Sequence, residues 1–176
     1  MPTIRAATED DVGLIFDLIC ELATYEKLRD EVVGTPEILR ESLFEQRAAE
    51  ALIVESAEGE AVGYALFYTT FSSFECRAGI WLEDVYVKPE HRRDGIGRKV
   101  LEHLAGIAEE RGNVRLEWVA LDWNEPALKF YEKLGAATLD DWLIHRLESD
   151  GIRRLAAATR GPRPGGGGGS ARSRCR

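Results

Sequence analysis

A run of arginine and glycine residues, Arg92-Arg93-Asp94-Gly95-Ile96-Gly97, has the composition of an anion-binding loop. It follows a segment with strand alternation and opens a segment with helical periodicity. The first amides of a helix lack intrahelical partners and carry a partial positive charge, and glycine lets a ligand approach the backbone. The loop can therefore bind a diphosphate. A tight turn explains the same residues equally well, and the third glycine of a dinucleotide fingerprint is missing.

A second run, Asn124 to Gly135, predicts a short helix with a chemically capable side chain. Asn124 is a good cap, Pro126 suits the first turn, and Gly135 suits the end. Tyr131 lies within this helix and carries a hydroxyl that could donate a proton. Taken alone, Tyr131 is better explained by core packing.

Two adjacent acids, Glu83 and Asp84, lie in the strand that we expect over residues 79–87. Side chains alternate along a strand, so neighbouring residues point to opposite faces. The alternation predicts Trp81 and Glu83 on one face, with Leu82, Asp84 and Tyr86 on the other. Only one of the two acids is therefore expected to face a cleft, and either could be a solvated surface charge.

The remaining pattern predicts an α/β domain with a mixed central β-sheet flanked by helices, in the order β-α-α-β-β-β-α-β-α-β. We expect strands at 3–5, 51–56, 61–71, 79–87, 114–121 and 141–147. We expect helices from Thr8 to about 23, at 36–46, at 96–111 and at 126–134, with a weak helix ending near Ala158. We assign residues 1–159 to one domain and expect the Gly/Arg-rich segment 160–176 to be a disordered tail.

The two motifs together resemble the GCN5-related N-acetyltransferase (GNAT) superfamily. The shared features are R-x-x-G-x-G after a strand, followed by strand–N-E-P-A-x-x-F-Y-x-x-x-G-A. Further segments are similar to the diamine and polyamine acetyltransferases, including the thialysine-acetylating relatives. These segments are I-R-x-A-T-x-x-D near the start, E-L-A-x-Y-E-K at 21–27, W-L-E-D-V-Y-V at 81–87 and V-A-x-x-W-N-E-P at 119–126.

The resemblance implies roles residue by residue. It implies that Tyr131 is the proton donor and that Glu83 is a substrate-contacting acid, able to act as a base through water. Acetyl-CoA is implied to contact Val85, Tyr86, Val87, Arg93, Asp94, Gly95, Ile96, Gly97, Arg98, Asn124, Glu125, Pro126, Ala127 and Tyr131. The amine is implied to contact Tyr25, Glu26, Glu83, Glu117, Trp118 and Val119. The resemblance also implies a homodimer.

Physical chemistry supports these implied roles. Acetyl transfer needs a neutral amine, whereas a primary amine has a pKa near ~10. Glu83 can hold the ammonium and accept its proton, directly or through water. Tyr131 can protonate the departing thiolate, because reference thiol and phenol pKa values differ by only about 1.5 units. The implied reaction is direct transfer in a ternary complex.

Composition narrows the classes of partner. The net charge is −8, and without the segment 160–176 the charge is −13, which disfavours nonspecific nucleic-acid binding and suits a small cationic amine. No apolar run approaches the ~20 residues of a membrane span, and the acidic start does not resemble a signal peptide. Three separated cysteines indicate reduced thiols in a cytoplasmic protein, and the three histidines show no metal spacing.

Other functions remain open at this point. The acceptor could be an amino acid, an aminoglycoside-like amine or a protein N-terminus. From other classes, the domain could be a non-catalytic acyl-CoA-binding sensor, or the basic tail could associate with nucleic acid. The presence of both Tyr131 and Glu83 speaks against a sensor, which needs no proton donor.

Overall fold

The computed structural model describes residues 2–92 and 94–159. The chain divides into two compact units, Met1–Asn124 and a second unit that begins at Glu125, and each is described by itself. Arg93 and the expected tail at 160–176 lie outside the described residues. The expected domain boundary at residue 159 stays a prediction.

The first unit contains a sheet with the strand order β1-β2-β3-β4-β5. The first four strands pair antiparallel in sequence order, whereas β4 and β5 are parallel, so the predicted mixed sheet is confirmed. The strand bounds are β1 Thr3–Ala6, β2 Glu50–Glu55, β3 Ala61–Ser72, β4 Arg77–Val87 and β5 Leu116–Glu117. The predicted strand at 114–121 is thus confined to two residues.

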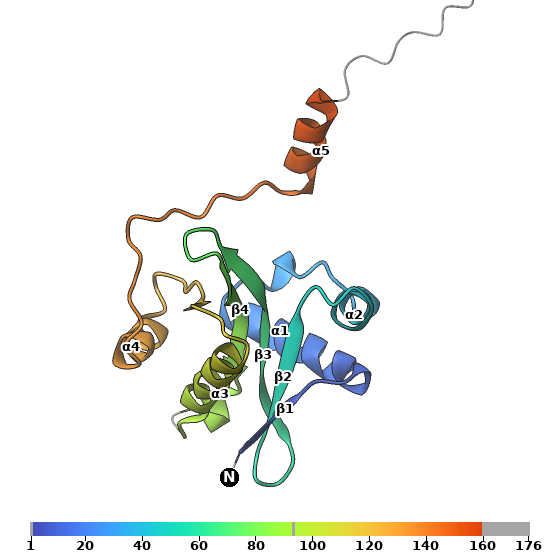
Figure 1. Ribbon diagram of the computed structural model, residues 1–176. Coiled ribbons are helices and arrows are strands. Elements are labelled where there is room, and N and C mark those ends of the chain that lie inside the picture. Colours follow the sequence, from blue (N-terminus) through green and yellow to red (C-terminus); the bar gives the residue numbers. More distant parts are fainter. Residues whose placement is uncertain (1, 93, 160–176) are drawn as a thin grey trace, which may run out of the picture. The chain divides into compact units, whose positions relative to one another are not determined.

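The helices of the first unit lie on both faces of this sheet, with α1 behind it and α3 in front (Figure 1). The larger helices are α1 Val12–Tyr25, α2 Pro36–Arg40 and α3 Ile96–Glu110. Thr35 caps α2, because its hydroxyl accepts a hydrogen bond from the Ile38 amide. Short single turns are η1 Glu9–Asp11, η2 Arg29–Glu31, η3 Glu41–Glu45 and η4 Pro89–His91. The predicted helix at 36–46 is therefore divided, since η3 is a π-turn.

The core between α1 and the sheet is a cluster of buried apolar side chains. Ile15 and Leu18 of α1 pack against Ile53 of β2, Tyr64 of β3 and Tyr86 of β4. The apolar face predicted for α1 is buried as expected, and complete burial of each such side chain contributes about 2 kcal/mol. The residues that α3 buries are Ile96, Val100, Leu101, Leu104 and Ala108.

The second unit contains two helices among its described residues, α4 Glu125–Lys133 and α5 Ser149–Ala158. Both agree with the predicted helices. The strand predicted from Asp141 to Leu147 is wrong, because this segment has no regular secondary structure. A strand is stabilised by hydrogen bonds to a neighbouring strand, and the described part of this unit contains none.

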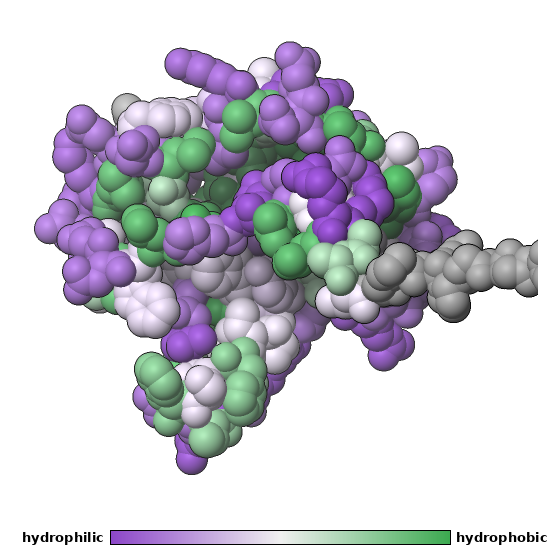
Figure 2. All heavy atoms as spheres, turned by 90° about the horizontal axis from the view of Figure 1, so that it is seen from above, coloured by the Kyte–Doolittle hydropathy of each residue, from purple (hydrophilic) through white to green (hydrophobic). Residues whose placement is uncertain are grey.

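Several large apolar side chains lie exposed in each unit. Figure 2 shows apolar groups among polar ones on one face of the molecule. Phe71 and Phe74 are exposed near the β3–β4 turn of the first unit, and Trp142, Leu143 and Ile144 are exposed in the second. No helix of the described chain is both long and apolar enough to cross a membrane.

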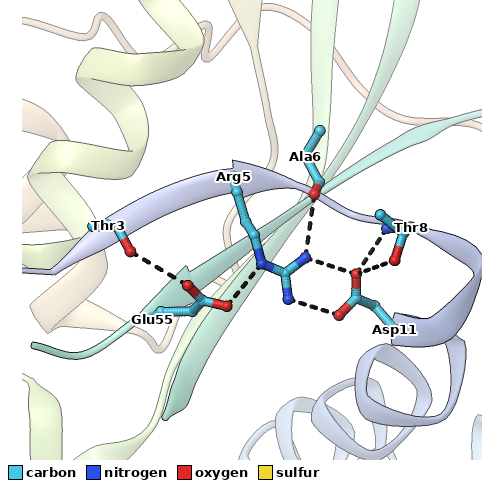
Figure 3. A network of polar contacts seen from close by, with 6 residues as sticks. All are labelled: Thr3, Arg5, Ala6, Thr8, Asp11 and Glu55. Atoms are coloured by element: carbon cyan, nitrogen blue, oxygen red, sulfur yellow. Dashed lines mark hydrogen bonds and ion pairs between the residues drawn. The ribbon is translucent and has the colours of Figure 1, made fainter. Parts of the chain in front are cut away.

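One polar network ties β1 to β2 and to the start of α1 (Figure 3). The Arg5 guanidinium donates two hydrogen bonds to the Asp11 carboxylate, at 2.7 and 2.8 Å, and a third to Glu55 at 2.7 Å. The Thr8 amide and hydroxyl also donate to Asp11. The Arg5 contact holds the pKa of Asp11 well below its usual range. The I-R-x-A-T-x-x-D segment therefore has a structural function.

We predict that Asp11→Asn lowers the free energy of unfolding by about 2 kcal/mol at pH 7, because a buried carboxylate loses charged hydrogen bonds. A depressed carboxyl pKa stabilises the fold above the unfolded-state value near ~3.9, and this contribution decreases as pH falls below it. Urea unfolding between pH 2.5 and 7 measures both effects. The exposed neighbour Asp10→Asn is the control, and equal pH dependence in wild type and Asp11→Asn would contradict the prediction.

Candidate active site

The anion-binding loop predicted from sequence leads directly into α3. Gly95 is the N-cap residue of α3 and has φ +76°, a left-handed conformation that favours glycine. A Cβ built on Gly95 would meet nothing within 4 Å, so space is open above this helix end. Gly95 offers no side chain to the first amides of the 15-residue helix, which leaves them suited to phosphate oxygens.

Two arginine side chains around this loop already contact other residues. Arg98 is exposed and its Nε lies 2.7 Å from a carboxylate oxygen of Glu102 on the same helix. Asp94 is exposed. The Arg92 side chain is held against aromatic rings of α1 and β4.

The outer edge of β4 is unpaired over most of its second half. β5 pairs with β4 only at Ile80 and Trp81, so from Leu82 onward no strand of the described chain continues the pairing. Val85 and Val87, predicted to contact the cofactor, lie on this open stretch and are partly buried. Tyr86 is buried in the core instead. An unpaired strand edge presents amide and carbonyl groups to an extended ligand.

A β-bulge in β4 changes the predicted orientation of its acids. Phe67 is opposite Leu82, but Leu66 is opposite Asp84, so Glu83 is an extra residue with no partner in β3. Such a bulge interrupts the alternation of side chains along the strand. The expectation that Leu82 and Asp84 share a face is therefore wrong.

The register places Trp81, Asp84 and Tyr86 on one face, together with their partners Tyr68, Leu66 and Tyr64. Ring contacts confirm this arrangement: Tyr68 and Trp81 are 6.4 Å apart between centroids, and Tyr64 and Tyr86 are 6.5 Å apart. Glu83 belongs to the same side, because the Trp81 indole Nε1 donates a hydrogen bond to its carboxylate at 3.0 Å. The prediction that only one of Glu83 and Asp84 faces this side is thus also wrong.

Asp84 is a residue whose importance the sequence analysis missed. The buried Tyr64 hydroxyl donates a 2.9 Å hydrogen bond to its carboxylate. Burial raises the pKa of Asp84 to about 6, while the Tyr64 hydrogen bond opposes that rise and the charges of Glu83 and Glu26 add to it. Two other carboxylates therefore act on Asp84, one from its neighbour in the bulge and one from the end of α1. Two adjacent acids in a strand were the available signal for such a site. The alternation expected for a regular strand assigned them to opposite faces.

Tyr25 and Glu26 occupy the C-terminal end of α1. Glu26 is half-buried, and burial raises its pKa. The Tyr25 hydroxyl donates to the Asn124 side-chain oxygen at 3.5 Å, and the Tyr25 ring lies 6.2 Å from that of Trp123. The structure therefore brings the predicted amine contact Tyr25 together with the predicted cofactor contact Asn124.

The predicted amine contacts Glu117, Trp118 and Val119 begin at the end of β5. The Glu117 carboxylate lies 2.7 Å from the Arg115 Nε, so its charge is already paired. Trp118 is partly buried and Val119 is exposed. Their contact with a substrate stays a prediction.

The predicted proton donor, Tyr131, lies in α4 of the second unit. It is partly buried, and its ring centroid is 5.3 Å from that of Phe130. Glu125, Pro126 and Ala127 form the first turn of the same helix, where Glu125 pairs with Lys129 at 2.8 Å. The roles of these four predicted site residues stay predictions.

Comparison with known proteins agrees with this fold and loop. The family model described as Acetyltransferase (GNAT) family matches residues 20–136. A thialysine N-epsilon-acetyltransferase from Bos taurus is 43% identical over 164 residues, covering 87% of this chain and 96% of the relative. An L-ornithine N5-acetyltransferase from Arabidopsis thaliana is 27% identical over 197 residues, covering 86% of each chain.

Among solved structures, an integron cassette protein from the mobile metagenome of V. cholerae superimposes with a TM-score of 0.73. It is 24% identical and covers 88% of this chain and 97% of its own, which supports the fold alone. The α/β fold agrees with the family match. The chain belongs to the GNAT acetyltransferase family.

We predict that Asp84→Asn removes a pH-dependent loss of stability. A carboxyl whose pKa rises on folding leaves stability intact below the unfolded value near ~3.9 and costs stability as pH rises through about 6. The wild type should therefore lose about 2 kcal/mol between pH 4 and pH 7 that the variant retains. Urea unfolding across this range measures the difference. The exposed Asp17→Asn of α1 is the control, and parallel curves for wild type and Asp84→Asn would contradict the prediction.

We predict that Gly95→Val weakens acetyl-CoA binding at least tenfold, since a β-branched residue is strained at φ +76° and fills the space above the helix end. Gly95→Asn, which tolerates the left-handed conformation, should show a smaller loss. Calorimetric titration with acetyl-CoA measures the affinity. Gly106→Ala within α3 is the control, and unchanged affinity in the folded Gly95→Val variant would refute the placement.

Proposed function

We propose that this chain transfers an acetyl group from acetyl-CoA to a primary amine of a small substrate that carries several charges. The substrate class we favour is thialysine and related diamino acids, with diamines and polyamines next. The observation that supports this proposal most strongly is the bulge in β4, which places the acids Glu83 and Asp84 on the same side as Tyr25 and Glu26 of the first unit.

The carboxylates explain why the acceptor should be cationic. Asp84 interacts electrostatically with both Glu83 and Glu26, and burial makes its negative charge costly. An ammonium group near these residues offsets that cost, because opposite charges favour each other's ionised forms. A substrate with a second charged group is held more strongly than a simple monoamine.

Glu83 is suited to receive the proton that the ammonium must lose. Its carboxylate is exposed, which lets a substrate or water approach, and the hydrogen bond from Trp81 restrains its orientation. A base acting in this way contributes about 10² to 10⁴ in rate. The neutral amine can then attack the thioester.

The loop residues Gly95 to Gly97 and the open edge at Val85 to Val87 are suited to hold the diphosphate and the extended arm of acetyl-CoA. Acetyl-CoA supplies the acetyl group as a thioester. Tyr131 donates a proton to the departing sulfur in this proposal. The family resemblance assigns that role to Tyr131, and its position in the motif of α4 supports it.

Two relatives inform the choice of acceptor. The Bos taurus protein is named for thialysine and the Arabidopsis thaliana protein for L-ornithine, and both substrates are diamino acids. The higher identity to the first favours thialysine. The homodimer implied by the resemblance stays part of the proposal.

The deciding experiment measures CoA release from acetyl-CoA with a panel of amines. The panel contains thialysine, ornithine, lysine, putrescine, spermidine, an aminoglycoside and a peptide with a free N-terminus. We expect the highest kcat/KM for thialysine or another diamino acid. Exclusive turnover of the aminoglycoside or the peptide would overturn the substrate class, and acetyl-CoA binding without any turnover would favour an acyl-CoA sensor.

We predict that Tyr131→Phe lowers kcat for the best amine about 100-fold and changes acetyl-CoA affinity less than threefold, because only the hydroxyl is removed. Steady-state kinetics and calorimetry on the same preparation separate the two quantities. A large loss of affinity with unchanged kcat would contradict the role of proton donor.

A further inference from the structure

We infer that Arg92 and Tyr25 form a latch that couples the cofactor loop to the end of α1 where the amine is bound. Both are positioning residues in this inference, which rests on the proposed function. The latch consists of the Arg92 guanidinium, the rings of Tyr25 and Tyr86, and the Val87 carbonyl. Its consequence is that each substrate strengthens the binding of the other.

Two elements, α1 and β4, meet at the Arg92 side chain. Its Nε donates a 2.9 Å hydrogen bond to the Val87 carbonyl at the end of β4. Its guanidinium carbon lies 4.4 Å from the Tyr25 ring centroid and 5.6 Å from that of Tyr86. The planar guanidinium of arginine can stack on a ring while its Nε donates, whereas the ammonium of lysine has no planar group to stack and no donor at the Nε position. The guanidinium thus joins α1 and β4 immediately before the loop that leads to α3.

Tyr25 also contacts the other side of the site. Its hydroxyl donates to Asn124, and its ring lies near Trp123, which in turn lies 5.8 Å from the Lys27 ammonium. Tyr25 is therefore a shared contact between the arginine before the cofactor loop and the turn that precedes α4. The contacts of Tyr25 with Arg92 and with Asn124 join residues 67 and 99 positions apart in the sequence. Helix formation alone therefore does not produce them.

The end of α1 is closed by local backbone hydrogen bonds and lies beside these contacts. Tyr25 is 37% exposed, and the next residue but one, Lys27, has φ +63° in the left-handed region. The Lys27 amide donates to the Thr24 carbonyl and the Leu28 amide to the Ala23 carbonyl, a common way for a helix to end, so the chain leaves α1 directly after Tyr25 and Glu26. Glu26 lies between Tyr25 and Lys27 and acts electrostatically on Asp84. A shift of Tyr25 therefore moves a carboxylate of the amine site.

The latch explains how binding at one site affects the other. Phosphate groups at the loop restrain the backbone next to Arg92, which holds the guanidinium against Tyr25 and keeps Glu26 in place. The amine then binds to an end of α1 that is already ordered, and linkage requires the effect to be equal in the reverse direction. The alternative is that Arg92 acts only on the cofactor phosphates, in which case α1 is unaffected.

The first test is hydrogen exchange of the amides at 20–28, measured on the full chain with and without saturating CoA. We expect CoA to slow this exchange at least fivefold in the wild type and by less than twofold in Arg92→Lys and Tyr25→Leu. Arg111→Lys is the matched control, because Arg111 also combines an aromatic contact, with Phe67, and a charged hydrogen bond, with Glu50, at the other end of α3. We expect it to behave as the wild type.

The second test is reciprocal affinity with the best amine of the panel. In the wild type, CoA should tighten amine binding about fivefold and the amine should tighten CoA binding by the same factor, and both factors should fall to about one in Tyr25→Leu. Wild-type protection in the CoA-saturated Tyr25→Leu variant, or an unchanged coupling factor, would overturn the latch while leaving the proposed function intact. Absence of CoA binding to the wild type would overturn both.

Discussion

β4 contains one residue more than β3 pairs with, and the candidate site lies around that extra residue, Glu83. Ten cross-strand pairs hold the two strands together, and the register shifts between Leu66 and Phe67 so that Glu83 has no partner. The apolar residues on both sides of the bulge are fixed by the core, since Leu82 and Tyr86 are both buried. The strand therefore cannot slip to remove the bulge without exposing one of them. The acids Glu83 and Asp84 are brought to the same side as Trp81 by this constraint.

Two contacts of β4 with its neighbours follow from that arrangement. The Tyr64 hydroxyl donates a hydrogen bond to Asp84 because both side chains face α1. Tyr86 faces the same side, where its ring lies near the Arg92 guanidinium. β5 pairs with β4 only as far as Trp81, and the bulge lies between Leu82 and Asp84. The open strand edge therefore begins where the alternation of side chains is interrupted. An electrostatic site, an edge suited to an extended ligand and the start of the cofactor loop thus follow one another along a single strand. The proposed acetyl transfer would use these three features together.

The sequence predicted the features that are encoded locally. Glycine before Ile96 predicts the start of α3, and the apolar segments 51–56 and 61–71 predict the strands β2 and β3. The bulge was not predictable in this way, because the alternation expected over residues 79–87 leaves no place for an extra residue and the register is decided by pairing with β3. The position of Arg92 depends on contacts with Tyr25, 67 residues away. The predicted strand at 141–147 failed for the same reason, since strand formation depends on a partner and not on composition alone.

The most direct test of this account is the register of β3 and β4 in solution. Cross-strand nuclear Overhauser effects on isotopically labelled protein report which backbone groups are opposite each other. The account predicts contacts between Phe67 and Leu82 and between Leu66 and Asp84, with Glu83 having no opposite residue. A contact between Leu66 and Glu83 in place of Leu66 and Asp84 would show an unbulged strand. That result would return the two acids to opposite faces and contradict the site described above.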